Sequence, residues 1–283
     1  MNFLAKPLGS ILSYIFNYIP DVGWSIIVLT VGVSVLLFPL TLKQTRATRA
    51  FSLMQPEMKR IQTEHKEDPA VLQAEMGRLQ KEHGASPAGC IGPMIVQMPI
   101  WFGLFRLLQS FVEIKNKKPN VVPKNLFLDV DSSLYAAIEN GNTLFSGMDL
   151  TLTPSEAFSV GSVLTVLPYV LFIIAMVATQ YFQQVYAQVG QPSSENAQVQ
   201  MTQNITKFLP VFFGAIAWNF TSGLIVYWAT SNLFRLGQQI AIVRIDGRPP
   251  QAGDQQVEQN EKEKPAASKS QGSAKKRQRR RRK

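Results

Sequence analysis

The residues of this chain best suited to chemistry are polar and aromatic side chains embedded in an apolar stretch near the C-terminal end. Residues 223–243 are long enough to form a membrane helix, yet they include Tyr227, Trp228 and Asn232. Hydroxyl, amide and indole groups are costly in lipid unless they find partners or line a wet cavity. Side chains of these types bind other groups through hydrogen bonds and ring contacts. The stretch therefore predicts polar surface held inside a membrane for a binding role.

Sequence patterns of common enzymes and metal sites are absent from the chain. Cys90 is the only cysteine, which excludes an intrachain disulfide and a cysteine-based zinc site. His65 and His83 stand among charged residues at expected helix ends, with no third ligand in view. Neither a Gly-x-x-x-x-Gly-Lys-Ser/Thr phosphate loop nor a Gly-x-Ser-x-Gly elbow occurs. We therefore expect no enzymatic activity, no cofactor and no metal.

Apolar runs alternate with charged stretches along the chain. A helix needs roughly 20 residues, at 1.5 Å each, to cross a hydrocarbon core of about 30 Å. Five candidate spans follow, of which the fourth is short: residues 24–42, 91–112, 160–182, 207–220 and 223–243. Only Thr221 and Ser222 separate the last two, so these must form an antiparallel pair. The predicted fold class is an all-α polytopic membrane protein with five transmembrane helices.

The segments between and before the spans are expected at the membrane surface or in water. Residues 1–20 carry an apolar face at helical spacing, without a signal-peptide cleavage site, and predict an amphipathic helix that lies in the membrane interface. Residues 113–159 and 183–206 are predicted to be loops. Their different lengths and charges bear on orientation.

Residues 43–90, between the first two spans, predict a helical hairpin. Apolar residues recur at helical spacing in 42–66 and in 69–83, with charged residues on the other faces. The stripe is rich in methionine: Met54, Met58 and Met76. Methionine suits adaptable contact with varied partners, so these residues are candidates for binding client chains. The alternative is that they only pack the two hairpin helices together.

The distribution of basic residues predicts the orientation. The hairpin segment holds eight Lys and Arg residues and the chain after Ile245 holds twelve, whereas residues 113–159 hold four. Cytoplasmic segments carry the excess of Lys and Arg. We therefore expect the hairpin and the C-terminus in the cytoplasm, and the N-terminus and residues 113–159 outside.

The C-terminal tail, residues 246–283, has few apolar side chains and is expected to be disordered. It ends in a basic cluster: Lys275, Lys276, Arg277, Arg279, Arg280, Arg281, Arg282 and Lys283. Such a cluster binds phosphates without reading bases, which suits RNA. The alternative is that the cluster binds anionic lipid headgroups.

Four motifs in register resemble the YidC/Oxa/Alb family of membrane protein insertases. They are Phe38-Pro39-Leu40-Thr41-Leu42-Lys43-Gln44, Leu53-Met54-Gln55-Pro56-Glu57-Met58-Lys59, Gly89-Cys90 with Gln97-Met98-Pro99-Ile100, and Thr221-Ser222-Gly223-Leu224 with Tyr227-Trp228 and Ser231-Asn232. The resemblance runs from about residue 3 to residue 245 and is closest to the short, Gram-positive type. It implies five helices around a polar groove that moves hydrophobic segments of nascent proteins from the cytoplasm into the bilayer, without nucleotide hydrolysis.

The resemblance also implies which residues line that groove: Thr30, Ser34, Gln97, Gln180, Tyr227, Trp228 and Asn232. For each of them the alternative is ordinary packing between helices. The family usually has an arginine at the place of Ser34 and a proline at the place of Thr221. By its depth in the second span, Arg106 is a candidate replacement for the missing arginine, and the alternative is that it reaches out to the lipid headgroups.

The partners that the resemblance implies are nascent membrane proteins, the ribosome and the Sec translocon, with anionic lipids as a further partner of the tail. Two other functions stay open at this point. A small-solute transporter or channel would also have polar residues in its spans, although no acidic residue lies within a span and no inverted repeat is visible. An assembly chaperone beside the translocon would have the same sequence features without inserting clients alone.

Overall fold

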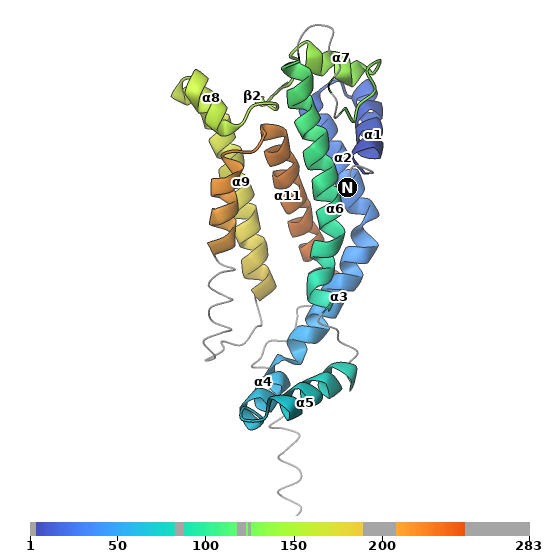
Figure 1. The fold of residues 1–283 in the computed structure, drawn as a ribbon, viewed down its shortest axis with the longest axis vertical. Coiled ribbons are helices and arrows are strands. Elements are labelled where there is room, and N and C mark those ends of the chain that lie inside the picture. The colour runs from blue at the N-terminus through green and yellow to red at the C-terminus, as the bar shows by residue number, and fades with distance from the viewer. Residues whose placement is uncertain (1–3, 83–87, 118–122, 124–125, 189–207, 247–283) are drawn as a thin grey trace, which may run out of the picture.

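The computed structural model describes the chain except for residues 1–3, 83–87, 118–122, 124–125, 189–207 and 247–283. It is a helical bundle with one small hairpin of strands (Figure 1). In chain order the labelled elements are α1 (Ala5–Tyr18), α2 (Val22–Leu36), α3 (Phe38–Leu53), α4 (Gln55–Glu64), α5 (Pro69–Glu82), α6 (Ala88–Lys115), α7 (Ser133–Glu139), β1 (Leu144–Phe145), β2 (Met148–Asp149), α8 (Pro154–Val160), α9 (Val163–Gln188) and α11 (Ser222–Asp246). A shorter apolar helix, Phe208–Ala217, precedes α11.

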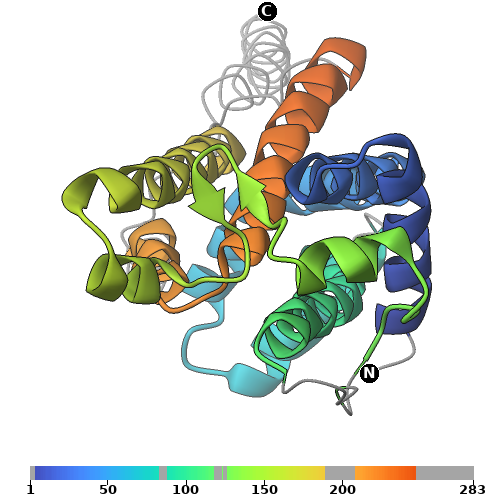
Figure 2. The same cartoon turned by 90° about the horizontal axis from the view of Figure 1, so that it is seen from above.

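Helix α11 lies at the centre of the bundle. It packs mainly against α9 on one side and α2 on the other, while α6 packs against α1 and α3 (Figure 2). Leu224 and Val226 of α11 are fully buried in the main apolar cluster, together with Leu104 and Leu107 of α6. The residues of α11 therefore meet side chains from several other helices.

The first predicted span and the first predicted hairpin helix are both interrupted. Helix α2 ends at Leu36 and α3 begins at Phe38, with a bend of 55° between them. Helix α3 ends at Leu53 and α4 begins at Gln55. A proline follows each break, Pro39 and Pro56, and proline cannot donate the backbone hydrogen bond that a continuous helix needs. The predictions of single helices over 24–42 and 42–66 were therefore wrong.

The predicted hairpin is present as α4 and α5. Asp68 starts α5, because its carboxylate accepts hydrogen bonds from the backbone N–H groups of Ala70 and Val71. Between the two helices Met54, Ile61 and Leu79 are buried. The pairing of the two helices thus has an apolar centre of its own, which lies at the end of the molecule opposite α7 and α8 (Figure 1).

The segment between α6 and α9, predicted as a plain loop, contains α7, β1, β2 and α8. The two strands pair antiparallel, Leu144 with Asp149 and Phe145 with Met148. Gly147 closes the turn with φ +82, a conformation that favours glycine. We call residues 143–152 the outer strap, because they cross the end of the bundle at α7 and α8 (Figure 2).

One helix of the described residues, Val163–Val185 within α9, is long and apolar enough to cross a membrane by itself. Counting the bent pair α2 and α3 as one span gives two. Helices α6 and α11 have the length, but they carry more polar residues, and Phe208–Ala217 is short. The number of five spans stays a prediction.

Candidate functional site

A stripe of polar side chains runs along α11. Tyr227, Ser231 and Arg235 follow one another at intervals of four residues, which places them on one side of the helix. The Nε2 of Gln97, on α6, donates a hydrogen bond of 2.8 Å to the Tyr227 hydroxyl. Tyr227 also hydrogen-bonds Ser231, and Arg235 lies one helical turn beyond Ser231. Gln97 and Tyr227, both predicted as site residues, are thus brought together.

The predicted residues of α2 have their hydroxyls satisfied within their own helix. Thr30 is buried and donates to the carbonyl oxygen of Ile26 at 2.6 Å, and Ser34 donates to that of Thr30 at 2.7 Å. Gln238 of α11 reaches the carbonyl oxygen of Ser34 at 3.4 Å. Such bonds let helices approach closely in a membrane. For Thr30 and Ser34 this geometry favours the packing interpretation.

Asn232 is buried next to α9 with only part of its polar surface satisfied. Its backbone oxygen accepts a hydrogen bond from Gln183 of α9. Its side-chain Nδ2 has no partner among the described residues, and the same is true of Nε1 of Trp101. Gln180, one turn from Gln183, is half-buried. These two N–H donors, like Nε2 of Gln184 on α9, are unsatisfied inside the bundle, which is costly unless a ligand or water meets them.

Trp228 belongs to an aromatic cluster formed by α6, α11 and the chain around Phe208–Ala217. Its ring lies 5.2 Å from Phe213, 6.1 Å from Phe220 and 6.4 Å from Trp101, measured between ring centroids. Trp101 in turn stacks on Phe105 at 5.4 Å. Rings at these distances attract one another and form an apolar surface beside the polar stripe of α11.

Arg106 does not face this site. The α6 residues that meet α11 include Trp101, which contacts Trp228, and Leu108, whose Cδ2 lies 3.2 Å from the position of a Cβ on Gly223. At about 100° per residue, Arg106 points roughly to the opposite side of α6, and its side chain is exposed.

Arg235 is the arginine at the site, and sequence reasoning missed it. It lies about 20 Å along α11 from Ser222 and has no acidic partner among the described residues. The sequence contained a signal for it, because Arg235 follows Ser231 by four residues and Tyr227 by eight, a spacing that puts all three on one side of a helix.

A separate hollow of about 1140 Å³ lies between α2, α9 and α11. Its walls are almost entirely apolar: Trp24, Ile27, Val31, Val35, Phe38, Leu171, Phe172, Ala175, Thr179, Ala229, Thr230, Leu233, Phe234, Gly237, Gln238 and Ala241. The hydroxyls of Thr179 and Thr230 donate to carbonyl oxygens of their own helices. This hollow therefore offers an apolar surface, unlike the polar groove that the resemblance implies.

The hairpin methionines lie mainly inside the hairpin. Met54 is 2% exposed, and Met58 and Met76 pack against the same buried cluster. This favours the packing interpretation over client contact. The basic cluster of residues 275–283 lies outside the described residues.

The start of the tail is attached to the base of the hairpin. Arg46 of α3 binds the carboxylate of Asp246 through Nε and Nη2, both at 2.8 Å. Within the described part of the chain, no group of three His, Cys, Asp or Glu side chains could hold a metal ion.

A helical bundle that includes a helix long and apolar enough to cross a membrane, with polar residues between its helices, defines a class, the helical membrane proteins. Within it, the family model of the 60Kd inner membrane protein matches residues 14–248, and the chain therefore belongs to this family. This confirms the resemblance that the four motifs indicated.

Curated relatives carry the name membrane protein insertase YidC. The protein of Wolinella succinogenes is 31% identical over 242 residues, which cover 86% of this chain and 37% of the relative. That of Campylobacter jejuni is 31% identical over 245 residues, covering 86% and 38%. The chain thus spans less than two fifths of the length of these relatives.

A solved structure has the same fold. It is a crystal structure of an active YidC insertase with the first transmembrane domain resolved, and it superposes with a TM-score of 0.51. The alignment has 19% sequence identity and covers 83% of this chain and 45% of that one.

Proposed function

We propose that this chain is a membrane protein insertase, which moves hydrophobic segments of nascent proteins from the cytoplasm into the bilayer. Its family membership supports the class of function. The observation that carries the mechanism is Arg235, an exposed cation about midway along α11, two helical turns from the Tyr227 that Gln97 hydrogen-bonds. An ionisable residue in the middle of a membrane helix is expensive, and by default it marks a functional site.

The energetics of insertion explain what such a site contributes. A charged residue of a client costs roughly 2.5–3.5 kcal/mol at the centre of a membrane helix. Hydrogen-bond donors along α11 would replace part of the water that the client loses. The client's apolar surface then stabilises the inserted state by about 25 cal/mol per Å² removed from water. Burial alone is therefore a sufficient energy source, and no nucleotide hydrolysis is required.

The donors at the site suggest which clients it favours. Arg235, the Nδ2 of Asn232 and the Nε1 of Trp101 all donate hydrogen bonds. Client segments that carry carboxylates or free carbonyl oxygens are acceptors, so acidic translocated tails should benefit most. In this proposal Arg235 takes the role that the resemblance gives to an arginine at the place of Ser34, and Arg106 does not.

For the surroundings of the site we keep the expectations drawn from the sequence. We propose five membrane spans in a bacterial plasma membrane, with the N-terminus outside and the hairpin and tail in the cytoplasm. The tail binds the ribosome through RNA phosphates or holds anionic lipid, and the Sec translocon is a further partner.

Reconstitution tests the proposal. The purified protein in liposomes, without nucleotide or other translocase, should insert a single-span client. Replacing Arg235→Gln should lower insertion of a client with an acidic tail by about tenfold, the equivalent of roughly 1.5 kcal/mol for one hydrogen bond to a charged group. Arg235→Lys should retain most of the activity, because it keeps the charge.

The matched control is Arg106→Gln, which removes a cation from α6 on the side away from α11. It should leave insertion unchanged. If Arg106→Gln and Arg235→Gln lower client insertion equally, Arg235 has no specific role. Insertion only with an added ATPase or translocon, or leakage of a small solute, would contradict the insertase function and favour an assembly chaperone or a channel.

A further inference from the structure

The helices of the bundle form two groups that meet mainly at α11. Helix α9 packs extensively against α11, α8 and β2 among the described elements, whereas α2, α3 and α6 belong with α1 and α7. The apolar hollow separates α2 from α9, with α11 as its floor. Apart from α11 and the ring contacts of Phe220 with Trp101 and Phe105, the outer strap is the connection between the group of α9 and the group of α2 and α6.

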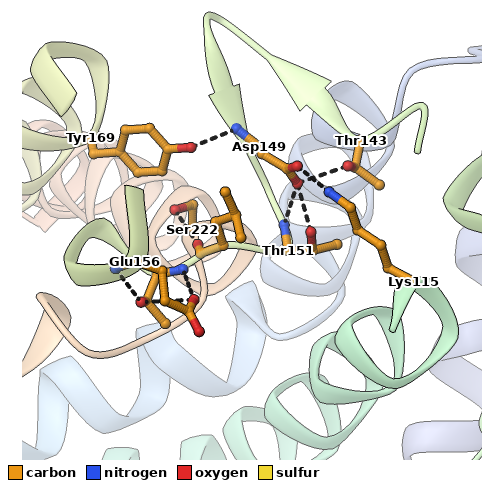
Figure 3. Close-up of polar contacts among 9 residues, drawn as sticks. Lys115, Thr143, Asp149, Thr151, Glu156, Tyr169 and Ser222 are labelled. Carbon is orange, nitrogen blue, oxygen red and sulfur yellow. Dashed lines mark hydrogen bonds and ion pairs between the residues drawn. The ribbon is translucent and has the colours of Figure 1, made fainter. Parts of the chain in front are cut away.

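Asp149 is the residue through which the strap holds both groups. Its carboxylate accepts hydrogen bonds from Lys115 at the end of α6, from Thr143 at 2.8 Å, and from the N–H and hydroxyl of Thr151 at 3.0 and 2.6 Å. Its backbone N–H donates to the hydroxyl of Tyr169, on α9, at 2.8 Å. Figure 3 shows these side chains converging from α6, the strap and α9.

The strap also fixes the ends of α2 and α11. The ring of Phe145 fills the space left by Gly23 and stands between Trp24 of α2 and Phe172 of α9, at 6.1 and 6.2 Å between centroids. At α11, the N–H groups of Ser222 and Gly223 donate to strap carbonyl oxygens, both at 2.9 Å. The first-turn N–H groups of α11 therefore have strap atoms as their partners.

Towards the hairpin end, the described residues connect the two groups mainly through α11, which contacts Gln183 of α9 and the backbone oxygen of Ser34 of α2. There, α9 runs beside α11, and α2 bends away into α3. The walls of the hollow are apolar side chains, which slide past one another more easily than a hydrogen-bonded network breaks.

We propose that the outer strap is a clamp, positioned by Asp149, that holds the two helix groups together at one end while they part at the hairpin end. If the chain is an insertase, as proposed above, the hollow between α2 and α9 widens from the hairpin end to admit a client helix. The clamp itself does not depend on that function.

Distances measured between spin labels in the full chain, reconstituted in lipid nanodiscs, test the clamp. With Cys90 replaced by Ser, one pair of labels is placed at the strap end, on Tyr18 and Val163, and a second pair nearer the hairpin end, on Leu36 and Tyr181. All four side chains are exposed. The strap-end pair should give one narrow distance distribution, and the hairpin-end pair a broader one.

Asp149→Asn keeps the shape of the side chain but removes its charge, and should broaden the strap-end distribution and shift it to longer distances. The matched control is Glu139→Gln, which breaks the ion pair between Lys117 and Glu139 at the same end but within one helix group. It should leave both distributions unchanged. If Asp149→Asn fails to fold, Lys115→Met tests the same ion pair from the α6 side.

A strap-end distribution as broad as the hairpin-end one in the wild-type chain would overturn the clamp. So would an unchanged narrow distribution in Asp149→Asn, or equal broadening in Glu139→Gln. A wild-type chain that shows the two expected distributions but inserts no client in liposomes would retain the clamp and remove the proposed function.

Discussion

Replacing Gly23 with alanine should destabilise the protein, because the strap occupies the place of the missing side chain. A Cβ at Gly23 would lie 2.1 Å from Cγ and 2.2 Å from Cδ2 of the Phe145 ring, far inside van der Waals contact. Phe145 is 8% exposed and has aromatic neighbours on two sides, so its ring has little room to move.

The size of the effect follows from two opposed contributions. Forcing an extra methyl group into a packed site costs about 1–3 kcal/mol. Removing the conformational freedom of glycine from a helix returns about 0.5–1 kcal/mol. The free energy of unfolding of Gly23→Ala should therefore fall by roughly 1–2 kcal/mol.

Gly32→Ala is the matched control, because Gly32 lies on the same helix and a Cβ there would have no atom within 4 Å. Only the backbone contribution applies, so this variant should be more stable than the wild type by about 0.5–1 kcal/mol. Reversible unfolding in mixed detergent micelles measures both. Combining Gly23→Ala with Phe145→Leu should recover part of the loss, since the shorter side chain makes room for the methyl group.

Equal stability of Gly23→Ala and Gly32→Ala would refute the close contact between α2 and the strap. A Phe145→Leu change that adds its full cost to that of Gly23→Ala would refute it as well, because residues in contact show a coupling energy of about 0.5–3 kcal/mol.

Three other outcomes are expected. Burial tends to raise the pKa of Asp149, but hydrogen bonds from Lys115, Thr151 and Thr143 outweigh it and hold the pKa below the ordinary 3.8. The stability that this carboxylate contributes is present above pH 3.8 and is lost as the pH falls through the pKa of the folded protein. Acidification from about pH 6 to about pH 3 should therefore lower the unfolding temperature more in the wild type than in Asp149→Asn. Leu79→Ala, at a side chain 4% exposed, should destabilise the α4–α5 hairpin by about 2–5 kcal/mol and speed its hydrogen exchange, whereas Val71→Ala, at 39%, should not. Deleting residues 275–283 should weaken ribosome binding and reduce its salt dependence, and an unchanged salt slope would leave only the lipid role for these cations.

The long helices could be predicted from the sequence because their signals are local. The apolar run 160–182 lies almost wholly within α9, and the run 223–243 lies within α11, which starts at Ser222. Asp68 before Pro69 correctly indicated the start of α5. The two helix breaks had an equally local signal, in Pro39 and Pro56, and a stricter reading of proline would have found them.

The outer strap could not be predicted, because its conformation depends on residues far away in the chain. Each strand has only two residues, too few to show a periodic pattern. Its position is set by contacts with Gly23, Lys115 and Ser222, which no local spacing brings together.

The candidate site was predicted in part for a related reason. Polar residue types in an apolar run singled out Tyr227 and Asn232 as groove residues; both are buried in the bundle, and their role in a groove stays a prediction. The choice of Arg106 rested on its depth in the membrane alone. Which way a side chain points around a helix axis depends on the neighbouring helices, and these are known only from the fold.

The ion pair between Arg46 and Asp246 fixes where the chain can be cut. Asp246 is the last residue of α11, yet by composition it belongs with the tail that follows. A truncation that begins at residue 246 would delete the carboxylate and leave the Arg46 guanidinium without that partner. A defect caused by this loss at the base of the hairpin would then be attributed wrongly to the missing basic residues 275–283. Shortened versions made for crystallisation, for fusion to a reporter or for testing the tail should therefore end after Asp246.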